Sequence, residues 1–441
     1  MDKKTFLTAR EAASALDISL PTLYSYVSRG MLHSEQVTGD SRIRRYRRED
    51  VLRLTERKEL RRNPAKAAAQ ILRWGSPVLE SGLTLISNGR FFYRGKDAVE
   101  LARSATVEEV AALLWTGDSS QAKQLFVGQP LRSRKKLLHF VDKIPKLGPI
   151  GSCQQALSLG AATDPSAHNL TSGAVARTGA RILVSLYSAV CATSAWVPLD
   201  LALTDAWIPS RRSAAQAIRA ALILCADHEL NVSAFTARCI ASAQATPYEV
   251  VLGALAAFSG RRHGGASEEV RALFNEAEGA RQYRSLLARR LRLAGHIPGF
   301  GHPLYTEGDP RARLLIDLSK IHGRSSATKI AENLIHAGQD LTGDYPNLDF
   351  GLVTLAYALG LPPDAAITLF ALGRTVGWIA HAIEQYADNQ LIRPRASYVG
   401  PIPDAHENSV PGRILKMRIG STDTSMISWK PAHGKRTSSD D

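Results

Sequence analysis

The sequence predicts a mainly α-helical protein in which a small basic module precedes a large helical unit. Three observations support this fold class. Alanine-rich amphipathic segments follow one another from about residue 97 onward. Runs with the apolar-polar alternation of a β-strand are scarce, apart from "LTLISNGRFFYRG" at residues 83–95. A hydrophobic content of 44% over 441 residues supplies enough apolar surface for more than one folded core.

Two helical patterns separated by a short break at residues 17–20 open the sequence. Thr8 is a favourable N-cap for the first pattern, and Glu11 three residues later completes a capping box. The second pattern begins near Pro21 and ends at Gly30, a residue suited to a left-handed C-cap. Two short helices joined by a tight turn predict a helix-turn-helix.

A basic strand and a further helix start follow in "VTGDSRIRRYRREDVLRL". Residues 38–41 have the composition of a turn, the arginine-rich strand after them suits a wing, and residues 50–54 begin a helix. Together with the ending "RRYRREDV", these features resemble the MerR or excisionase type of winged helix-turn-helix over roughly the first 55 residues.

The resemblance implies DNA binding by this module. The residues expected to face a major groove are Ser19, Thr22, Tyr24, Ser25 and Arg29, and those expected to meet phosphates are Arg44, Arg45, Arg47 and Arg48. Residues 1–66 contain 15 Lys/Arg against 9 Asp/Glu, a large share of the net charge of +14. The alternative is a solvated assembly module whose arginines only keep it soluble.

A charged helix, "LTERKELRRNPAKAAAQILRWGSP", joins the two units. Asn63-Pro64 breaks it, so we place the boundary near residue 65, with the winged module and linker helix at residues 1–65. The polar residues 431–441 are expected to form a disordered tail.

Cysteine spacing and the N-terminal composition favour a cytoplasmic protein. The four cysteines lie in apolar segments at spacings that fit neither metal sites nor redox motifs, so we expect buried thiols and no metal. No basic region followed by an apolar core opens the sequence, so a secretory signal is not expected. The most apolar stretch, residues 180–203, is interrupted by Ser, Thr and Pro, which favours a core or interface helix over a membrane span.

Three histidine-bearing turns stand out in the large unit. They are "ADHELN" with His228, "GRRHGGASEEV" with His263 before a helix that Ser267 is expected to cap, and "GFGHPLYTEGDPR" with His302. In the last, Asp309 and Pro310 predict a helix start. Arg311 then projects where helix N–H groups already attract anions.

Taken with "LDF", "GRTVGWIAH" and "IRPRASYVGP", these motifs resemble the citrate synthase family in order and spacing, from about Gly82 to Pro401. The segment "FFYRGKDAVELARSATVEEVAALLWTGD" is similar to that family's early region. The resemblance implies a two-domain, all-helical fold. It also implies an acyltransferase of the tricarboxylic acid cycle that condenses acetyl-CoA with oxaloacetate and water to citrate and CoA.

The implied roles agree with what the reaction requires. Asp349 is expected to be the base that deprotonates the thioester methyl, and His263 the donor to the thioester oxygen. His302, aided by His228, is expected to polarise the oxaloacetate carbonyl. The guanidiniums expected to hold its carboxylates are those of Arg311, Arg374 and Arg393.

Purely structural roles remain open for these residues. Asp349 is a possible N-cap of the helix that follows it, and Arg374 and Arg393 are possible partners of helix carboxylates such as Glu384. We interpret the glycines around His302 as letting acyl-CoA and substrate approach the backbone closely.

Three positions depart from the family pattern. Gly260-Arg261-Arg262 precedes His263 in place of an apolar turn, Ser267 replaces a common Asn, and Thr306 stands where a basic residue often binds CoA phosphates. We hypothesise that Arg261 or Arg262 supplies the missing charge.

The resemblance further implies a homodimer with a large domain at residues 66–265 and 373–430 and a small domain at residues 266–372. Gly264, Gly265 and Gly373 would then lie near the crossings and absorb a closing rotation. Arg393 would serve the partner's site, and two winged modules would read a pseudo-palindromic DNA site. No cofactor is expected, because acetyl-CoA is a substrate.

Two other functions remain open. One is a 2-methylcitrate synthase that uses propionyl-CoA, since one methylene changes binding by only about 1–3 kcal/mol. The other is a DNA-binding regulator that uses the helical unit as a metabolite sensor.

Overall fold

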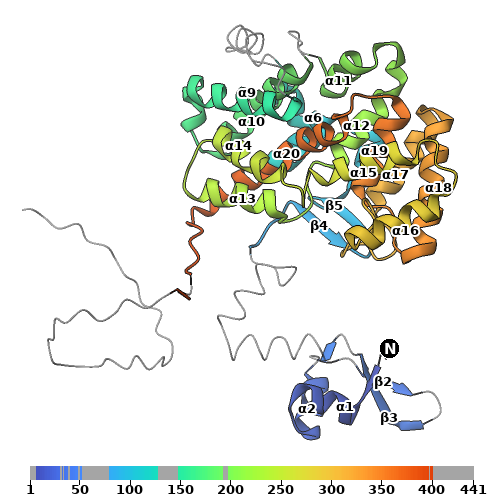
Figure 1. Ribbon diagram of the computed structural model, residues 1–441. Coiled ribbons are helices and arrows are strands. Elements are labelled where there is room, and N and C mark those ends of the chain that lie inside the picture. Colours follow the sequence, from blue (N-terminus) through green and yellow to red (C-terminus); the bar gives the residue numbers. More distant parts are fainter. Residues whose placement is uncertain are drawn as a thin grey trace, which may run out of the picture. The chain divides into compact units, whose positions relative to one another are not determined.

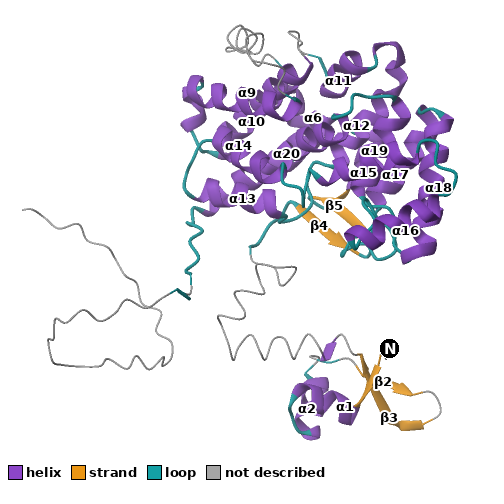
Figure 2. Ribbon diagram, viewed as in Figure 1, coloured by secondary structure: helices purple, strands orange, loops and turns teal. Residues whose placement is uncertain are grey.

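The computed structural model describes residues 6–29, 32, 34–37, 40–47, 50–51, 79–127, 148–191, 197–396 and 398–400, and every structural statement below concerns these residues. Helices dominate the large unit, and strands are confined to two small sheets (Figures 1 and 2). The predicted mainly α-helical class is confirmed.

The N-terminal module combines two helices with a three-stranded antiparallel sheet. Its elements are β1 (Phe6–Thr8), α1 (Ala9–Leu16), α2 (Leu20–Ser28), β2 (Ser34–Val37) and β3 (Asp40–Arg47). The strand order is β1-β3-β2, so the basic strand β3 is central and pairs with β2 as a wing.

A separate apolar core holds this module together. Four of its members are at most 2% exposed and pack with one another: Ala12, Leu16, Leu23 and Tyr46. A core that shares no residue with that of the large unit is what an independently folding domain requires.

Local capping explains where the two helices begin. Thr8 accepts from the Glu11 amide at 3.3 Å and Glu11 accepts from the Thr8 amide at 2.8 Å, so the predicted capping box is confirmed. Ser19 caps α2, with Pro21 in its first turn. The C-cap is Arg29, and Gly30, the predicted cap, lies outside the described residues, as does the linker helix.

The large unit contains fifteen described helices and one small hairpin. The helices are α5 (Ala98–Ser104), α6 (Val107–Thr116), α7 (Ala122–Phe126), α9 (Pro149–Thr163), α10 (Ser172–Cys191), α11 (Leu199–Trp207), α12 (Ala215–Leu224), α13 (Val232–Ser242), α14 (Pro247–Phe258), α15 (Ala266–Ala277), α16 (Tyr283–Ala294), α17 (Pro310–His322), α18 (Ser325–Thr342), α19 (Leu348–Leu359) and α20 (Ala365–Asp388). Three short 3₁₀ helices are η1 (Ser119–Gln121), η2 (Pro165–His168) and η3 (Pro209–Ala214).

The strand-like stretch at residues 83–95 forms a hairpin, as its alternation predicted. Strand β4 (Thr84–Ser87) pairs antiparallel with β5 (Arg90–Tyr93), and β5 pairs with β6 (Lys96–Asp97). Phe91 and Tyr93 on β5 are fully buried against the helices. The hairpin therefore belongs to the helical core.

Helix α20 forms the centre of the large unit, with α6, α10, α12, α13, α14 and α19 packed around it (Figure 1). It is long and apolar enough, by length and composition alone, to cross a membrane, but 94% of its apolar window is buried in the fold. An all-round apolar helix is expected at the centre of a large helical core.

Two glycines let α20 pack closely against the end of α12 and the segment that follows it. A Cβ on Gly373 would lie 2.4 Å from the carbonyl oxygen of Leu222, and one on Gly377 would lie 2.3 Å from that of Ala226. The structure therefore shows Gly373 in a close packing contact. A role for it in domain closure stays a prediction.

The predicted small domain contains helices α15 to α19, which pack mainly against one another. The proposed domain limits, including the tail at residues 431–441, stay predictions. All four cysteines are free, but Cys191 and Cys239 are only half-buried, so the expectation of buried thiols holds for Cys153 and Cys225 alone.

Candidate active site

His228 lies in the turn between α12 and α13, directly after the buried Asp227. Its Nε2 is 2.8 Å from the hydroxyl of Tyr305, and its ring lies edge-on to His302 with 5.4 Å between the centroids. Burial lowers the pKa of His228 well below its usual value, and Arg311 and Arg374 lower it further. His228 therefore meets the site as a neutral imidazole.

His302 sits in the glycine-rich turn before α17. Leu304 donates its amide to Nδ1 of His302 at 3.2 Å, which leaves the ring proton on Nε2. Burial, with the charge of Arg311, lowers the pKa of His302 to about 4. A neutral imidazole with its proton on Nε2 is a suitable donor to a carbonyl oxygen.

Backbone conformation explains the glycines of this turn. Gly299, Gly301 and Gly308 have φ angles of 83°, 79° and 107°, which side-chain-bearing residues rarely adopt. A Cβ on Gly299 would also lie 3.0 Å from Val270 and Phe350. The turn itself thus requires these glycines. Their interpretation as openings for ligand approach stays a prediction.

Asp309 both starts α17 and orients Arg311. Its carboxylate accepts the amide of Arg311 at 3.0 Å, as the predicted N-cap, and the Nε and Nη2 groups of the same guanidinium at 2.9 and 2.7 Å. Burial opposes the charged form of Arg311, but the ion pair with Asp309 keeps its pKa above the usual value. The buried guanidinium is thereby fixed in the site, also facing Phe91 and Tyr305.

His263 follows α14 and contacts α13 and α20. Its Nε2 is 2.8 Å from the hydroxyl of Ser233, which also accepts the indole N–H of Trp378 at 3.0 Å. Its ring packs edge-on against Phe258 and Phe370. Burial, reinforced by Arg374, lowers the pKa of His263 to about 3, so this imidazole is also neutral at physiological pH.

Asp349 lies in the first turn of α19. The N-cap is Asn347, whose side chain accepts the amides of Asp349 and Phe350, so the capping alternative for Asp349 is wrong. Oδ1 of Asp349 is buried and has no hydrogen-bond partner among the described residues. Burial raises the pKa of this carboxyl to about 7 although Arg311 and Arg374 oppose the rise.

Arg374, on α20, is 1% exposed and donates its Nε to the carbonyl of Cys225 at 2.7 Å. Within the described part of the chain no carboxylate pairs with it, and Glu384 pairs with Arg238 instead. Burial lowers the pKa of Arg374. A buried guanidinium without an anionic partner is costly, which favours an anionic ligand at this point.

Six predicted residues lie close enough together that the two arginines among them affect the pKa values of the other four. Arg374 acts on the pKa values of His228, His263 and Asp349, and Arg311 acts on those of His228, His302 and Asp349. Arg393 belongs to a separate unit that begins at residue 393, so its place in a site stays a prediction.

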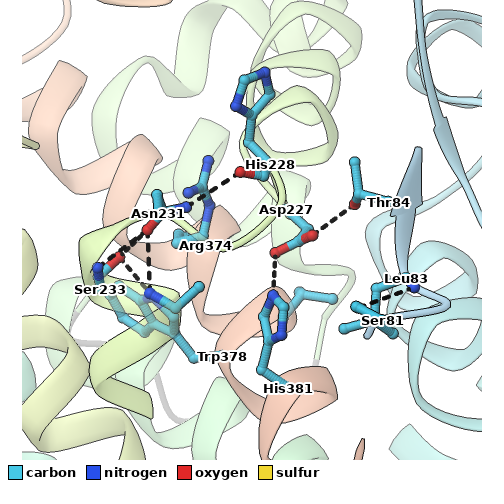
Figure 3. A network of polar contacts seen from close by, with 12 residues as sticks. Ser81, Leu83, Thr84, Asp227, His228, Asn231, Ser233, Arg374, Trp378 and His381 are labelled. Carbon is cyan, nitrogen blue, oxygen red and sulfur yellow. Dashed lines mark hydrogen bonds and ion pairs between the residues drawn. The ribbon is translucent and has the colours of Figure 1, made fainter. Parts of the chain in front are cut away.

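A polar chain that sequence reasoning missed lies beneath the His228 turn (Figure 3). Asp227 accepts from Thr84 at 2.5 Å and from Nε2 of His381 at 3.2 Å. Arg238 donates to Nδ1 of His381 at 3.2 Å. The only signal in the sequence was the position of Asp227 beside His228, because the partners lie more than 140 residues away along the chain.

The positions that depart from the family pattern differ in exposure. Arg261 and Arg262 are exposed, and Arg261 is 3.3 Å from Glu269. Thr306 is exposed. Ser267 is buried inside α15 and donates to the Gly264 carbonyl at 2.9 Å, so our prediction that it caps this helix is wrong; Gly265 is the N-cap.

The N-terminal module exposes most of the side chains predicted to meet DNA. Tyr24 is 53% exposed, and Arg29, Arg44 and Arg45 are exposed as well. The hydroxyl of Thr22 is 2.8 Å from that of Ser19 at the helix start. The side chain of Arg47 and the whole of Arg48 lie outside the described residues.

Comparison with known proteins gives two family matches. The family model described as "Citrate synthase, C-terminal domain" matches residues 72–395, and the one described as "Helix-turn-helix domain" matches residues 6–59. Citrate synthase 2 of Bacillus subtilis is 30% identical over 352 residues, which cover 74% of this chain and 95% of the relative.

Two further relatives have similar coverage. 2-Methylcitrate synthase 1 of Corynebacterium glutamicum is 28% identical over 337 residues, 70% of this chain and 88% of the relative. The crystal structure of citrate synthase from Thermotoga maritima has a TM-score of 0.62 at 28% identity, covering 75% of this chain and 95% of that one.

Proposed function

The chain belongs to the citrate synthase family, and from this premise we propose that it condenses acetyl-CoA with oxaloacetate and water to give citrate and CoA. The relatives named citrate synthase and 2-methylcitrate synthase support the reaction class. The arrangement of Asp349, His263, His302 and the arginines supports two steps, formation of the enol and its attack on the oxaloacetate carbonyl.

Carbon nucleophile formation needs a base and a donor together. Asp349, with its unpartnered oxygen and raised pKa, removes a proton from the thioester methyl. The Ser233 hydroxyl, which lies 2.8 Å from both Nε2 of His263 and Oδ1 of Asn231, occupies Nε2 and leaves Nδ1 for the thioester oxygen. Donation from Nδ1 requires the Ser233 proton to point at His263 rather than at Asn231. The enol is thus stabilised by a neutral donor, which suits an oxygen that gains partial negative charge.

Carbon–carbon bond formation then takes place at the oxaloacetate carbonyl. Nε2–H of His302 donates to the carbonyl oxygen and draws electron density from the carbon that the enol attacks. The condensation product still carries the thioester, so water must cleave it to release CoA. Arg311 and Arg374 hold the substrate carboxylates, with Arg393 added in the dimer we expect.

The size of the acyl group divides two versions of this proposal. A propionyl group would give 2-methylcitrate by the same steps, and the contacts of the site do not favour it over acetyl.

Arg261 and Arg262 are proposed to bind CoA phosphates. A double alanine variant should then have a higher KM for acetyl-CoA than the wild type, and an unchanged KM would refute the role.

Asp349 carries this proposal, because its buried Oδ1 has no hydrogen-bond partner among the described residues, a costly arrangement that is typical of functional sites. The test is thiol release from acetyl-CoA, and separately from propionyl-CoA, on addition of oxaloacetate. We expect release by the wild type and at least about a hundredfold less by Asp349→Ala. No release with either thioester would reject condensation.

A second candidate function, DNA binding, rests on the helix-turn-helix match and on the exposed arginines at the end of α2 and on β3, namely Arg29, Arg44 and Arg45. It is compatible with catalysis. If the helical unit proved inactive but bound oxaloacetate or acyl-CoA, the protein would instead be a metabolite-sensing regulator.

A further inference from the structure

The turn that carries His228 is held in a conformation that it would not adopt alone. Glu229, the next residue, has a φ of 52°, in the left-handed region that costs a side-chain-bearing residue about 1 kcal/mol or more. Such a conformation persists only where surrounding contacts fix it. The contacts of this turn therefore decide where the imidazole of His228 points.

Asp227 is fully buried and makes several of those contacts. Figure 3 shows its side chain bonded to Thr84 and to His381. Its two carboxylate oxygens accept from Thr84 on β4 and from His381 on α20. Its amide donates to the hydroxyl of Tyr93 on β5 at 3.2 Å, and that hydroxyl also lies 2.9 Å from the Ile223 carbonyl. One residue thus joins the hairpin, the central helix and the His228 turn.

A chain of donors fixes the direction of the His381 hydrogen bond. Arg238 has no acceptor atom, so its Nε–H donates to Nδ1 of His381. The imidazole proton must therefore sit on Nε2 and point at Asp227. Glu384 holds Arg238 in turn, and it also accepts from the Ser81 hydroxyl and the Gly82 amide at 2.9 Å each.

Close packing prevents the turn from relaxing away from α20. A Cβ on Gly377 would lie 2.6 Å from Oδ1 of Asp227, so the carboxylate rests directly on the helix backbone. Arg374, one turn earlier on α20, holds the Cys225 carbonyl at the start of the same turn. The helix that provides a substrate-binding guanidinium therefore also fixes the histidine.

We propose that Asp227 is a positioning residue: bonded to Thr84 and His381, it holds the 225–229 turn so that His228 and Arg374 meet oxaloacetate in one fixed geometry. This inference rests on the proposed function, because it assigns His228 and Arg374 to the oxaloacetate site. A merely structural Asp227 would affect stability and all kinetic constants alike, whereas a positioning residue affects oxaloacetate selectively.

The test compares full-length Asp227→Ala with Asp227→Asn by thiol release and thermal melting. In Asp227→Asn the amide oxygen still accepts from His381, and the amide nitrogen donates to the Thr84 hydroxyl, so the turn keeps both bonds. We expect Asp227→Ala to raise the KM for oxaloacetate about 10- to 100-fold without a comparable change for the acyl-CoA. Asp227→Asn should recover most of that loss.

A second pair covers the case in which Asp227→Ala does not fold. Thr84→Val removes the hydroxyl and keeps the shape, and Thr84→Ser keeps the hydroxyl. Thr84→Val should raise the KM for oxaloacetate about tenfold over Thr84→Ser, as expected for a lost bond to a charged group. Thr163→Val is the matched control, because the Thr163 hydroxyl bonds only within α9.

Each outcome decides the inference. A folded Asp227→Ala protein with an unchanged KM for oxaloacetate, or equal KM values for the two Thr84 variants, would overturn it while condensation still stands. If the wild type releases no thiol, calorimetric binding of oxaloacetate replaces the KM, and selective loss in Asp227→Ala supports the inference. A wild type that neither condenses nor binds oxaloacetate rejects both proposals.

Discussion

Single residues in this site are defined by burial as much as by identity. Three histidines are neutral because burial disfavours their charged form, and Asp349 has a raised pKa for the same reason. A neutral donor and a basic carboxylate are the pair that enol formation needs near neutral pH. The same desolvation thus prepares acid and base groups at once.

The pKa of Asp349 predicts the pH dependence of the reaction. Only the ionised carboxylate accepts a proton, so kcat/KM for the acyl-CoA should rise with pH and level off above an apparent pKa of about 7. His263 and His302, with pKa values of about 3 and 4, do not titrate in this range. Initial rates measured from pH 5.5 to 9 check this, and a profile that is flat across that interval would contradict it.

An independent check uses stability without substrate. A folded-state pKa above the unfolded value means that ionisation of Asp349 costs stability, a cost absent below about pH 4 and complete above about pH 7. At pH 8, Asp349→Asn should therefore have a free energy of unfolding up to about 4 kcal/mol higher than that of the wild type. Its melting temperature should be higher as well. The difference should shrink as the pH falls toward 4.

At the scale of elements, α20 decides the geometry of the site. It contributes Arg374 and His381. Its glycines allow close packing against the chain that leads from α12 to His228. Helix α13 adds Ser233 and Arg238, and the β4–β5 hairpin adds Thr84 and Tyr93. The site therefore depends on how these three elements pack.

Substitution of Gly377 tests this packing. In Gly377→Ala the new methyl would meet the Ala226 carbonyl at 2.3 Å, and backbone does not move aside easily. We expect a loss of about 1–3 kcal/mol in stability from overpacking and a raised KM for oxaloacetate. Gly173→Ala on α10 is the control, since the nearest atom to its methyl is the tip of Arg177 at 3.7 Å, and it should not destabilise the protein. Equal melting temperatures for the two variants would refute the packing argument.

At the scale of the whole molecule, the chain combines a unit of the citrate synthase family with an N-terminal helix-turn-helix module. The module has its own apolar core, so substitutions on its surface should leave the helical unit unchanged. This separation allows the two proposed functions to be tested in the same full-length protein.

DNA binding should respond to the wing arginines alone. Arg44→Ala with Arg45→Ala removes two exposed guanidiniums on β3 and should lower affinity for duplex DNA and reduce the salt dependence of log Kd by about two. Thiol release should stay at the wild-type level. Fluorescence anisotropy over a series of salt concentrations measures the affinity for DNA and its salt dependence. An unchanged salt slope would exclude phosphate contacts by this strand.

Inspection of the sequence was enough to predict the fold class, the capped starts of α1 and α17, the β4–β5 hairpin and the family. These are set by short-range patterns: a capping box at Thr8, an Asp-Pro pair at Asp309 and alternation at residues 83–95. The same local reasoning was wrong at Ser267, because α15 begins earlier than predicted, with Gly265 as its N-cap. For Asp349 it left a capping role open, which the structure assigns to Asn347.

The surroundings of each functional group, in contrast, could be read only from the folded chain. Asp227 meets Thr84 and His381 across more than 140 residues of chain, and Ser233 meets His263 and Trp378 from three different segments. The raised pKa of Asp349 likewise depends on burial by packed helices. Hydrogen-bond partners and desolvation are properties of packing. The order of the motifs therefore identified the candidate residues, whereas their protonation states and hydrogen-bond partners required the fold.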